Sequence, residues 1–373
     1  MKKRNINWII YIFTAFFSFG YGVTIPVVPL YAKSLEASYF IIGLIGAAYG
    51  FSYTLSAAPL GRLSDKIGRN KMLSLSASLA ASSSILYTLS QSAFQLIFIK
   101  VLEGISWAAF FPSVEAAVTE KEEKSGKAMG VCATLYGVGF ALASIFGGVL
   151  VDYFGYKLPF LVYFIFSLAS LGLTVFIPST LTKLSVSSNE LFEKDFKLTL
   201  KIALSISFGY SFILAIILYF FPVYGKALNL SATIIGFFLT VFWIARIISF
   251  IFLGSLSDKL GRKNILLFTL SLSMAASSGI IYAQEKVALI FMGFTLGLGL
   301  GAPFPVTIAL ISDKTSPNRK GMAMGLFETA SAAGQAFSPF IGGLASEFLS
   351  LNAPFLLCSF IAFSCVLVSL KIK

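Results

Sequence analysis

An eleven-residue polar segment occurs twice in this chain, each time between two long apolar stretches. Residues 61–71 read GRLSDKIGRNK, and residues 254–264, 193 positions later, read GSLSDKLGRKN. The flanking stretches have the length, about 20 residues, with which a helix crosses the hydrocarbon core of a bilayer. One polar signature at the same point of two halves indicates a duplicated membrane protein. Duplicated helical halves are typical of secondary transporters.

The composition agrees with a membrane protein, because 57% of the residues are hydrophobic and only 12% are charged. Soluble domains average about 25% charged residues. We therefore predict an all-α membrane protein whose twelve transmembrane helices form two pseudo-symmetric six-helix bundles. The predicted spans are 7–31, 40–60, 72–90, 94–118, 127–151, 158–179, 199–224, 232–253, 264–283, 286–312, 321–346 and 352–370.

The repeat extends along both halves. Residues 29–35 match residues 222–228 at the same offset of 193, and Gly147-Gly148 matches Gly342-Gly343 at an offset of 195. An even number of spans per half inserts both halves the same way up, with the twofold axis along the membrane normal. We predict an N-terminal bundle over 1–180, a polar cytoplasmic linker over 181–198 and a C-terminal bundle over 199–373.

The basic residues predict the orientation. With the N-terminus in the cytoplasm, 22 of the 28 Lys and Arg residues lie inside, and both termini are cytoplasmic. The outside loops hold Lys33, Lys157, Lys226 and Lys286, and two further cations, Lys100 and Arg246, lie within spans. The net charge of +12 thus requires no nucleic acid, and it favours anionic lipid headgroups at the cell membrane.

Several classes of chemistry have no support in the sequence. Phosphate-binding loops, metal-ligand clusters and nucleophile–base groupings are missing, so we expect neither an enzyme nor a cofactor or metal site. The cysteines Cys132, Cys358 and Cys365 lie inside spans and read as small apolar fillers. Because the chain contains no histidine, any proton coupling must use carboxylates, together with Lys, Tyr or water.

Over essentially its whole length the chain resembles the major facilitator superfamily. Both polar segments are similar to that family's loop signature, Gly-x-x-x-Asp-Arg/Lys-x-Gly-Arg-Arg/Lys, and residues 19–31, FGYGVTIPVVPLY, are similar to span 1 of its drug–proton antiporters. Two positions depart from the antiporter pattern. Ala143-Ser144 replaces the Gly-Pro pair of span 5, and Lys100 with Glu103-Gly104 replaces an Arg followed by Gln-Gly in span 4.

The resemblance implies a conformational role for the two loop segments, with Asp65 docking on the start of span 11 to hold the halves closed inside. We predict two ion pairs, Arg69 with Glu120 and Arg262 with Asp313. Alternatively, these charges only fix the topology. The gating candidates are Gly61, Asp65, Gly68, Arg69, Glu120, Gly254, Asp258, Gly261, Arg262 and Asp313.

Charges inside spans are candidates for proton coupling or substrate binding, because each costs about 2.5–3.5 kcal/mol at a helix centre. The candidates are Lys100, Glu103, Glu115, Arg246 and Glu328, and their equivalents in the other half are uncharged. Lys100 and Glu103 are one turn apart and can form a structural pair, or Glu103 can be a proton site. Glu115 is a coupling acid or a conformational lock. Arg246 either pairs with Glu328 or binds an anionic substrate.

The candidate walls of a cavity are the aromatic residues Tyr21, Tyr53, Trp107, Phe110, Tyr136, Tyr210 and Trp243. Alternatively, these residues face lipid or pack between helices, as most aromatic residues must in a chain with 39 Phe. Gly297, Gly299, Gly301, Pro303 and Pro305 predict a thin, bendable stretch in span 10. We therefore predict a monomeric secondary transporter of small molecules in the cell membrane, working by alternating access and driven by protons. Export of amphipathic compounds is the first hypothesis. Uptake of a small organic anion or sugar by symport is the second, and a non-transporting membrane sensor or scaffold is a remote third.

Overall fold

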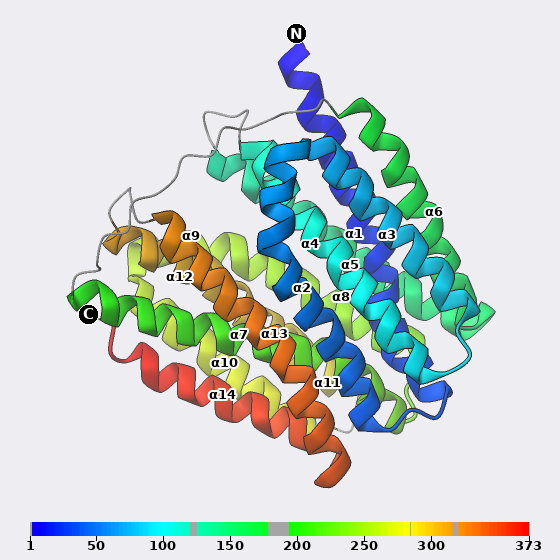
Figure 1. Cartoon of the computed structure of the whole chain (residues 1–373). Helices are drawn as coiled ribbons and strands as arrows, with labels where there is room; N and C mark the ends of the chain where they lie inside the picture. The colour runs from blue at the N-terminus through cyan, green and yellow to red at the C-terminus, as the bar shows by residue number, and fades with distance from the viewer. Residues whose placement is uncertain (1, 120–124, 178–193, 284, 316–319, 373) are drawn as a thin grey trace.

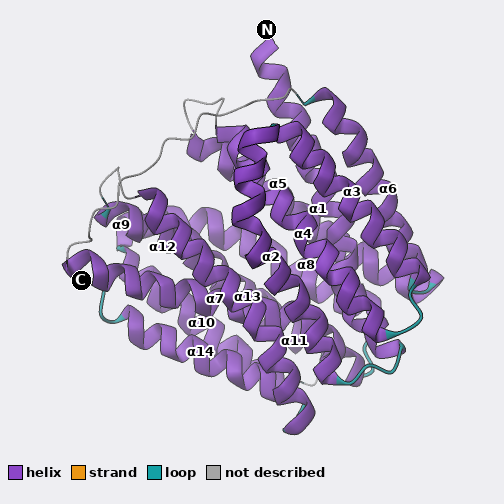
Figure 2. Ribbon diagram, viewed as in Figure 1, coloured by secondary structure: helices purple, strands orange, loops and turns teal. Residues whose placement is uncertain are grey.

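The computed structural model describes residues 2–119, 125–177, 194–283, 285–315 and 320–372. Within these ranges every regular element is a helix (Figure 2). The first half contains α1 (Lys2–Ser34), α2 (Tyr39–Ile67), α3 (Arg69–Leu89), α4 (Ala93–Thr119), α5 (Ser125–Phe154) and α6 (Lys157–Leu173), which the 3₁₀ turn η1 (Thr174–Phe176) extends.

The second half contains two rods that are interrupted. The elements are α7 (Lys194–Ala227), α8 (Ala232–Ile248) with the π-helical η2 (Ser249–Leu253) and α9 (Gly254–Leu260), α10 (Arg262–Tyr282), α11 (Lys286–Gly301) with α12 (Pro303–Lys314), α13 (Lys320–Phe348) and α14 (Ala353–Ser369). Counted as rods, the described helices number twelve, which confirms the predicted fold class. Ten rods are long and apolar enough to cross a membrane, and α14 is a shorter apolar helix.

Two boundaries differ from the prediction. Helix α7 begins at Lys194, so the last residues of the predicted linker, 194–198, are helical. Residues 61–67 and 254–260, expected in loops, are helical as well, and the chain turns only at Gly68 and Gly261. Their φ angles of 98° and 90° lie in the region that favours glycine, so one residue suffices to end each helix.

Equivalent positions of the sequence repeat have the same local structure in both halves. Ser38 and Ser231, 193 positions apart, both cap a helix N-terminus by accepting the backbone N–H three residues further on. Gly68 and Gly261 share the same offset and the same backbone conformation. Equivalent residues therefore start and end equivalent helices in the two halves.

The halves meet along two helix pairs, α2 against α13 and α5 against α8. In Figure 1, α2 lies beside α13, with α1, α3, α4 and α6 to the upper right and α10 and α14 to the lower left. Helices α5 and α8 approach so closely that a Cβ on Gly148 would lie 2.2 Å from the carbonyl oxygen of Ala232. A Cβ on Gly43 would likewise lie 2.4 Å from the carbonyl oxygen of Pro339, between α2 and α13.

Because twelve rods alternate in direction, both chain ends and the two polar segments lie on one side of the bundle, which we call the terminal side. The opposite side, with residues 35–38 and 228–231, is the far side. Large apolar side chains such as Phe94, Phe98 and Phe291 are exposed on the outer helix faces. Exposed aromatic side chains on apolar helices are suited to contact lipid.

Candidate functional site

A cavity lies between the two halves, with an empty volume of about 1440 Å³ counted together with its open solvent. Helices α1, α2, α4 and α5 line it from the first half, and α7, α8, α12 and α13 line it from the second. The wall includes Tyr21, Ile25, Tyr49, Tyr53, Trp107, Phe111, Tyr136, Phe140, Tyr210, Leu214, Tyr219, Trp243, Arg246, Phe250, Phe304, Glu328 and Gln335. The site is thus mostly aromatic with a few polar groups, as small-molecule sites usually are.

The structure brings six of the predicted wall residues to this cavity: Tyr21, Tyr53, Trp107, Tyr136, Tyr210 and Trp243. Phe110 does not line it. Its side chain is 1% exposed and stacks on Phe17 in the first half, with ring centroids 4.4 Å apart. The sequence reasoning missed Tyr49 and Tyr219, although Tyr49 precedes Tyr53 by one helical turn and so shares its face.

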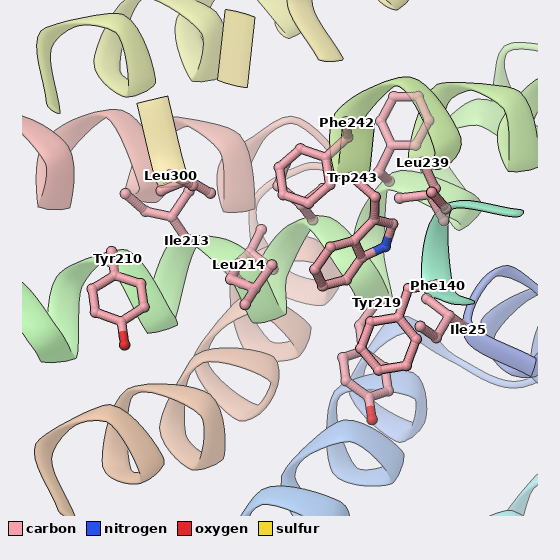
Figure 3. Close-up of a cluster of buried hydrophobic side chains, with 14 of the residues drawn as sticks. Ile25, Phe140, Tyr210, Ile213, Leu214, Tyr219, Leu239, Phe242, Trp243 and Leu300 are labelled. Atoms are coloured by element: carbon pink, nitrogen blue, oxygen red, sulfur yellow. The ribbon is translucent and has the colours of Figure 1, made fainter. Parts of the chain in front are cut away.

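Aromatic contacts join the halves at the cavity wall. The rings of Phe140 from α5 and Trp243 from α8 are 5.0 Å apart. Figure 3 shows these two side chains beside Ile25 of α1 and Tyr219 of α7. Four helices from both halves therefore meet around one cluster, and any rocking of the halves must rearrange it.

Arg246 and Glu328 are the charged residues of the cavity wall, one on α8 and one on α13. The Cζ atom of Arg246 lies 5.0 Å from the ring centroid of Trp243. Of the two alternatives for Arg246, the pairing with Glu328 is not found among the described ion pairs within 4.0 Å. The reason is their placement. Helix α8 packs on α5 and α11, whereas α13 packs on α2 and α7, so the two residues face the cavity from helices with different neighbours.

The break in span 10 fixes the backbone next to Arg246. Helix α11 ends at Gly301 and α12 starts at Pro303, as the glycines and prolines of this stretch predict. A Cβ on Gly301 would lie 2.3 Å from the carbonyl oxygen of Arg246, so the two backbones touch there. Ser249 in η2 donates to the carbonyl oxygen of Leu298 at 2.6 Å and accepts the N–H of Ala302 at 3.0 Å, which satisfies groups freed by the break.

Lys100 and Glu103 form the predicted pair on α4, and both are buried, with exposures of 2% and 0%. They lie behind the cavity wall and not in it, since Lys100 Nζ is 5.3 Å and 5.5 Å from the ring centroids of Tyr21 and Tyr49. The hydroxyl of Tyr87 donates to Glu103 Oε2 at 3.2 Å. Glu115, further along α4, is partly buried and is not among the residues of the wall.

On the terminal side, each polar segment forms the same internal cluster. Asp65 pairs with Arg69 at 2.6 Å, and Asp258 pairs with Arg262 at 2.5 Å, one turn apart in each case. The expected pair of Arg262 with Asp313 is present, with Nε 3.3 Å from Oδ2. Glu120, the expected partner of Arg69, lies outside the described residues. The docking of Asp65 on the start of span 11 stays a prediction. A gating role for these groups remains a prediction.

The far side carries two carboxylates that the sequence reasoning missed, Asp152 and Glu347. Asp152 at the end of α5 accepts from the backbone N–H groups of Ala232, at 3.0 Å, and Thr233, at 2.8 Å, at the start of α8. Glu347 at the end of α13 accepts from the N–H of Tyr39, at 2.9 Å, at the start of α2.

These far-side carboxylates, Asp152 and Glu347, each tie one half to a helix N-terminus of the other. Unpaired amides and the positive end of the helix dipole make that terminus a favourable place for a negative charge. The two residues are 195 positions apart, the offset that also relates Gly147-Gly148 to Gly342-Gly343. An acid at equivalent positions of both halves was therefore visible in the sequence as part of the repeat.

Replacing both far-side carboxylates by amides (Asp152→Asn with Glu347→Gln) is expected to shift the population about 5- to 30-fold toward a state open on the far side. Each amide keeps an acceptor oxygen but loses the interaction of the negative charge with the exposed helix N-terminus, worth about 0.5–1 kcal/mol, and the losses at two distant sites add. Distances between spin labels at Ser34 and Ser350, exposed far-side positions in different halves, measure the shift. Glu36→Gln, an exposed acid on the same side, is the control. Equal distance distributions in the double variant and the wild type would contradict a clamping role.

Comparison with known proteins agrees with this architecture. The family model described as Major Facilitator Superfamily matches residues 10–284 and residues 203–372. Multidrug resistance protein 2 of Bacillus subtilis (strain 168) is 28% identical over 389 residues, which cover 96% of this chain and 94% of that protein.

Two solved structures share the fold. The human organic anion transporter MFSD10 (TETRAN) aligns with a TM-score of 0.70 at 16% identity, covering 99% of this chain and 100% of that one. A bacterial homolog of the human lysosomal transporter Spinster, in an inward-facing and unoccupied conformation, aligns with a TM-score of 0.71 at 13% identity, covering 99% and 94%. At these identities the likeness concerns the fold alone.

Proposed function

The chain belongs to the major facilitator superfamily, and on that basis we propose that it exports amphipathic compounds across the cell membrane in exchange for protons. Family membership makes it a multi-pass membrane transporter of small molecules and not an enzyme. The observation that carries the proposal is the cavity between the halves, with its aromatic wall and its single carboxylate among the described residues, Glu328. The name of the multidrug resistance relative supports efflux.

The aromatic wall suits the apolar part of an amphipathic compound. Rings such as Tyr21, Tyr53, Trp107 and Trp243 offer large apolar faces with polar edges. Such a surface binds many ring systems without requiring one hydrogen-bond pattern, because stacking depends little on the substituents. A broad range of substrates follows from this kind of wall.

Glu328 is the proposed site of proton exchange. A carboxylate holds either a proton or the positive group of a ligand, so each displaces the other when it binds. By thermodynamic linkage the displacement works equally in both directions, which couples the two fluxes. The proton gradient then drives the ligand outward as protons enter.

Alternating access follows from the contacts between the halves. The close approaches at Gly43 and Gly148 and the far-side carboxylates hold the halves together at the far side. We assign the terminal side to the cytoplasm because the basic residues cluster there. This conformation is then closed toward the outside, and the protein, acting as a monomer, rocks about the cavity to open there.

Uptake of a small organic anion by symport with protons is the second candidate, and Arg246 in the cavity wall favours it. The direction of coupling separates the two functions. In liposomes with an imposed pH gradient, export by exchange requires protons and substrate to move in opposite directions, whereas symport moves both the same way.

Glu328→Gln is expected to reduce accumulation driven by a pH gradient by about tenfold or more, equivalent to about 1.4 kcal/mol of lost coupling. The glutamine keeps the shape of the side chain but cannot exchange a proton. Substrate–substrate counterflow without a gradient is expected to continue. Both fluxes are measured in liposomes, with Glu285→Gln, an exposed acid at the start of α11, as the matched control. Gradient-driven accumulation at the wild-type level in the Glu328 variant would show that another group carries the proton.

A further inference from the structure

The cavity wall contains hydrogen-bond donors that the protein leaves unused. The indole Nε1 atoms of Trp107 and Trp243 have no hydrogen-bond partner among the described residues, although the side chains are only 6% and 4% exposed. The guanidinium of Arg246 lies over the ring of Trp243, with no carboxylate of the described chain within 4.0 Å. Donors thus outnumber their partners on this part of the wall.

An unpaired donor in a buried place is costly. A polar N–H removed from water without a partner loses about 1–3 kcal/mol, and a charged group loses more. Arg246 has five N–H donors in a planar fork that matches a carboxylate in two bonds. A ligand with an acidic group would satisfy this fork and the neighbouring indole of Trp243 together.

The fold itself does not require these donors. Arg246 corresponds to Tyr53 in the first half, and Trp243 corresponds to Gly50, both on α2. The same bundle architecture is therefore built without a guanidinium or an indole at this level. The difference between the halves indicates that the pair serves a ligand.

Glu328 gives the same cavity a negative end. It lies on α13, while Arg246 lies on α8, and no ion pair joins them. Two opposite charges held apart in one aromatic cavity match a ligand that carries the complementary charges at its two ends.

We propose that the preferred substrates are aromatic zwitterions, with an acidic group that pairs with Arg246 and a basic group that faces Glu328. This inference rests on the proposed function and names its substrate class. The ammonium group of the ligand displaces the proton of Glu328, which leaves to the cytoplasmic solution, and the carboxylate accepts from Arg246 and from Trp243 Nε1. The aromatic body lies between the rings of the wall.

A matched set of three compounds tests the charge requirement: 4′-(aminomethyl)biphenyl-4-carboxylic acid, a zwitterion; its methyl ester, a cation; and its N-acetyl derivative, an anion. Binding to the purified protein is measured by calorimetry and by quenching of tryptophan fluorescence. The zwitterion is expected to bind at least about tenfold more tightly than either derivative, which corresponds to about 1.4 kcal/mol.

Two variants test which residue binds each charged end of the ligand. Arg246→Met is expected to weaken the binding of the zwitterion about tenfold or more and to leave the affinity for the ester unchanged. Glu328→Gln is expected to remove the preference for the zwitterion over the N-acetyl anion. Lys286→Met, an exposed cation at the start of α11, controls for loss of charge. Equal affinities for the three compounds, or an Arg246→Met protein that still prefers the zwitterion over its ester, would overturn the inference.

The two proposals fail in different ways. If none of the three compounds binds while a pH gradient still drives export of a cationic dye such as ethidium, the zwitterion inference is wrong and the export function stands. If an imposed pH gradient drives no compound in the direction opposite to the protons, the export function is wrong, whatever the binding data show.

Discussion

Replacing Gly148 by valine is expected to reduce transport about 5- to 150-fold while both bundles remain folded. A Cβ at this position would lie 2.2 Å from the carbonyl oxygen of Ala232 and 2.7 Å from its carbonyl carbon, so α5 and α8 cannot keep their present distance. Backbone atoms cannot rotate away as a side chain can. The halves must separate on the far side to relieve the clash.

The size of the effect follows from the cost of overpacking. Extra methyl groups at a tight contact cost about 1–3 kcal/mol. The far side must close once in each transport cycle, and this cost makes the closed state about 5- to 150-fold less populated. The internal packing of each bundle is unaffected, because the contact joins one half to the other.

The same helix supplies the control. A Cβ on Gly130 of α5 would meet nothing within 4 Å, so Gly130→Val tests the loss of a helical glycine without a clash. Transport in liposomes and the distance between labels at Ser34 and Ser350 are measured for both variants. Wild-type transport by the Gly148 variant would show that closure of α5 on α8 is not part of the cycle.

Much of the fold could be predicted because the repeat and the apolar spans are properties of local sequence. The length of an apolar segment decides whether it can span the membrane, and equivalent segments of the two halves can be compared at an offset of 193. The helical state of residues 61–67 and 254–260 does not follow from their polar composition, which is typical of loops. In fact only Gly68 and Gly261 end these helices, through their positive φ.

The sequence predicts which kinds of residue line the site, but not which charged residues pair there. Six of the aromatic residues named as candidates line the cavity, since large apolar rings are the usual lining of a small-molecule site. Which charges meet depends on helix rotation and on neighbours, which a single sequence does not give. Arg246 and Glu328 belong to helices with different partners and form none of the described ion pairs, whereas Lys100 and Glu103 lie one turn apart on a single helix and do pair.

Lys100→Met is expected to destabilise the protein by about 3–5 kcal/mol, the usual cost of removing one partner of a buried ion pair. Glu103 would keep its carboxylate at 0% exposure. Among the described residues, the Tyr87 hydroxyl would be the remaining partner of Oε2, and Oε1 has no hydrogen-bond partner even in the intact pair. Thermal unfolding in detergent, followed by size-exclusion chromatography, measures the loss.

The double variant Lys100→Met with Glu103→Leu is expected to recover most of that stability, because replacing a whole buried pair by apolar side chains is often neutral. The equivalent of Glu103 in the second half is Leu296, so the fold already accepts leucine at this level. The pair lies behind the cavity wall, and Glu328 lies in it, so the stable double variant is expected to keep proton-driven transport. A folded double variant that binds substrate but no longer exchanges protons would instead make Glu103 the coupling acid, with Lys100 as its charge partner.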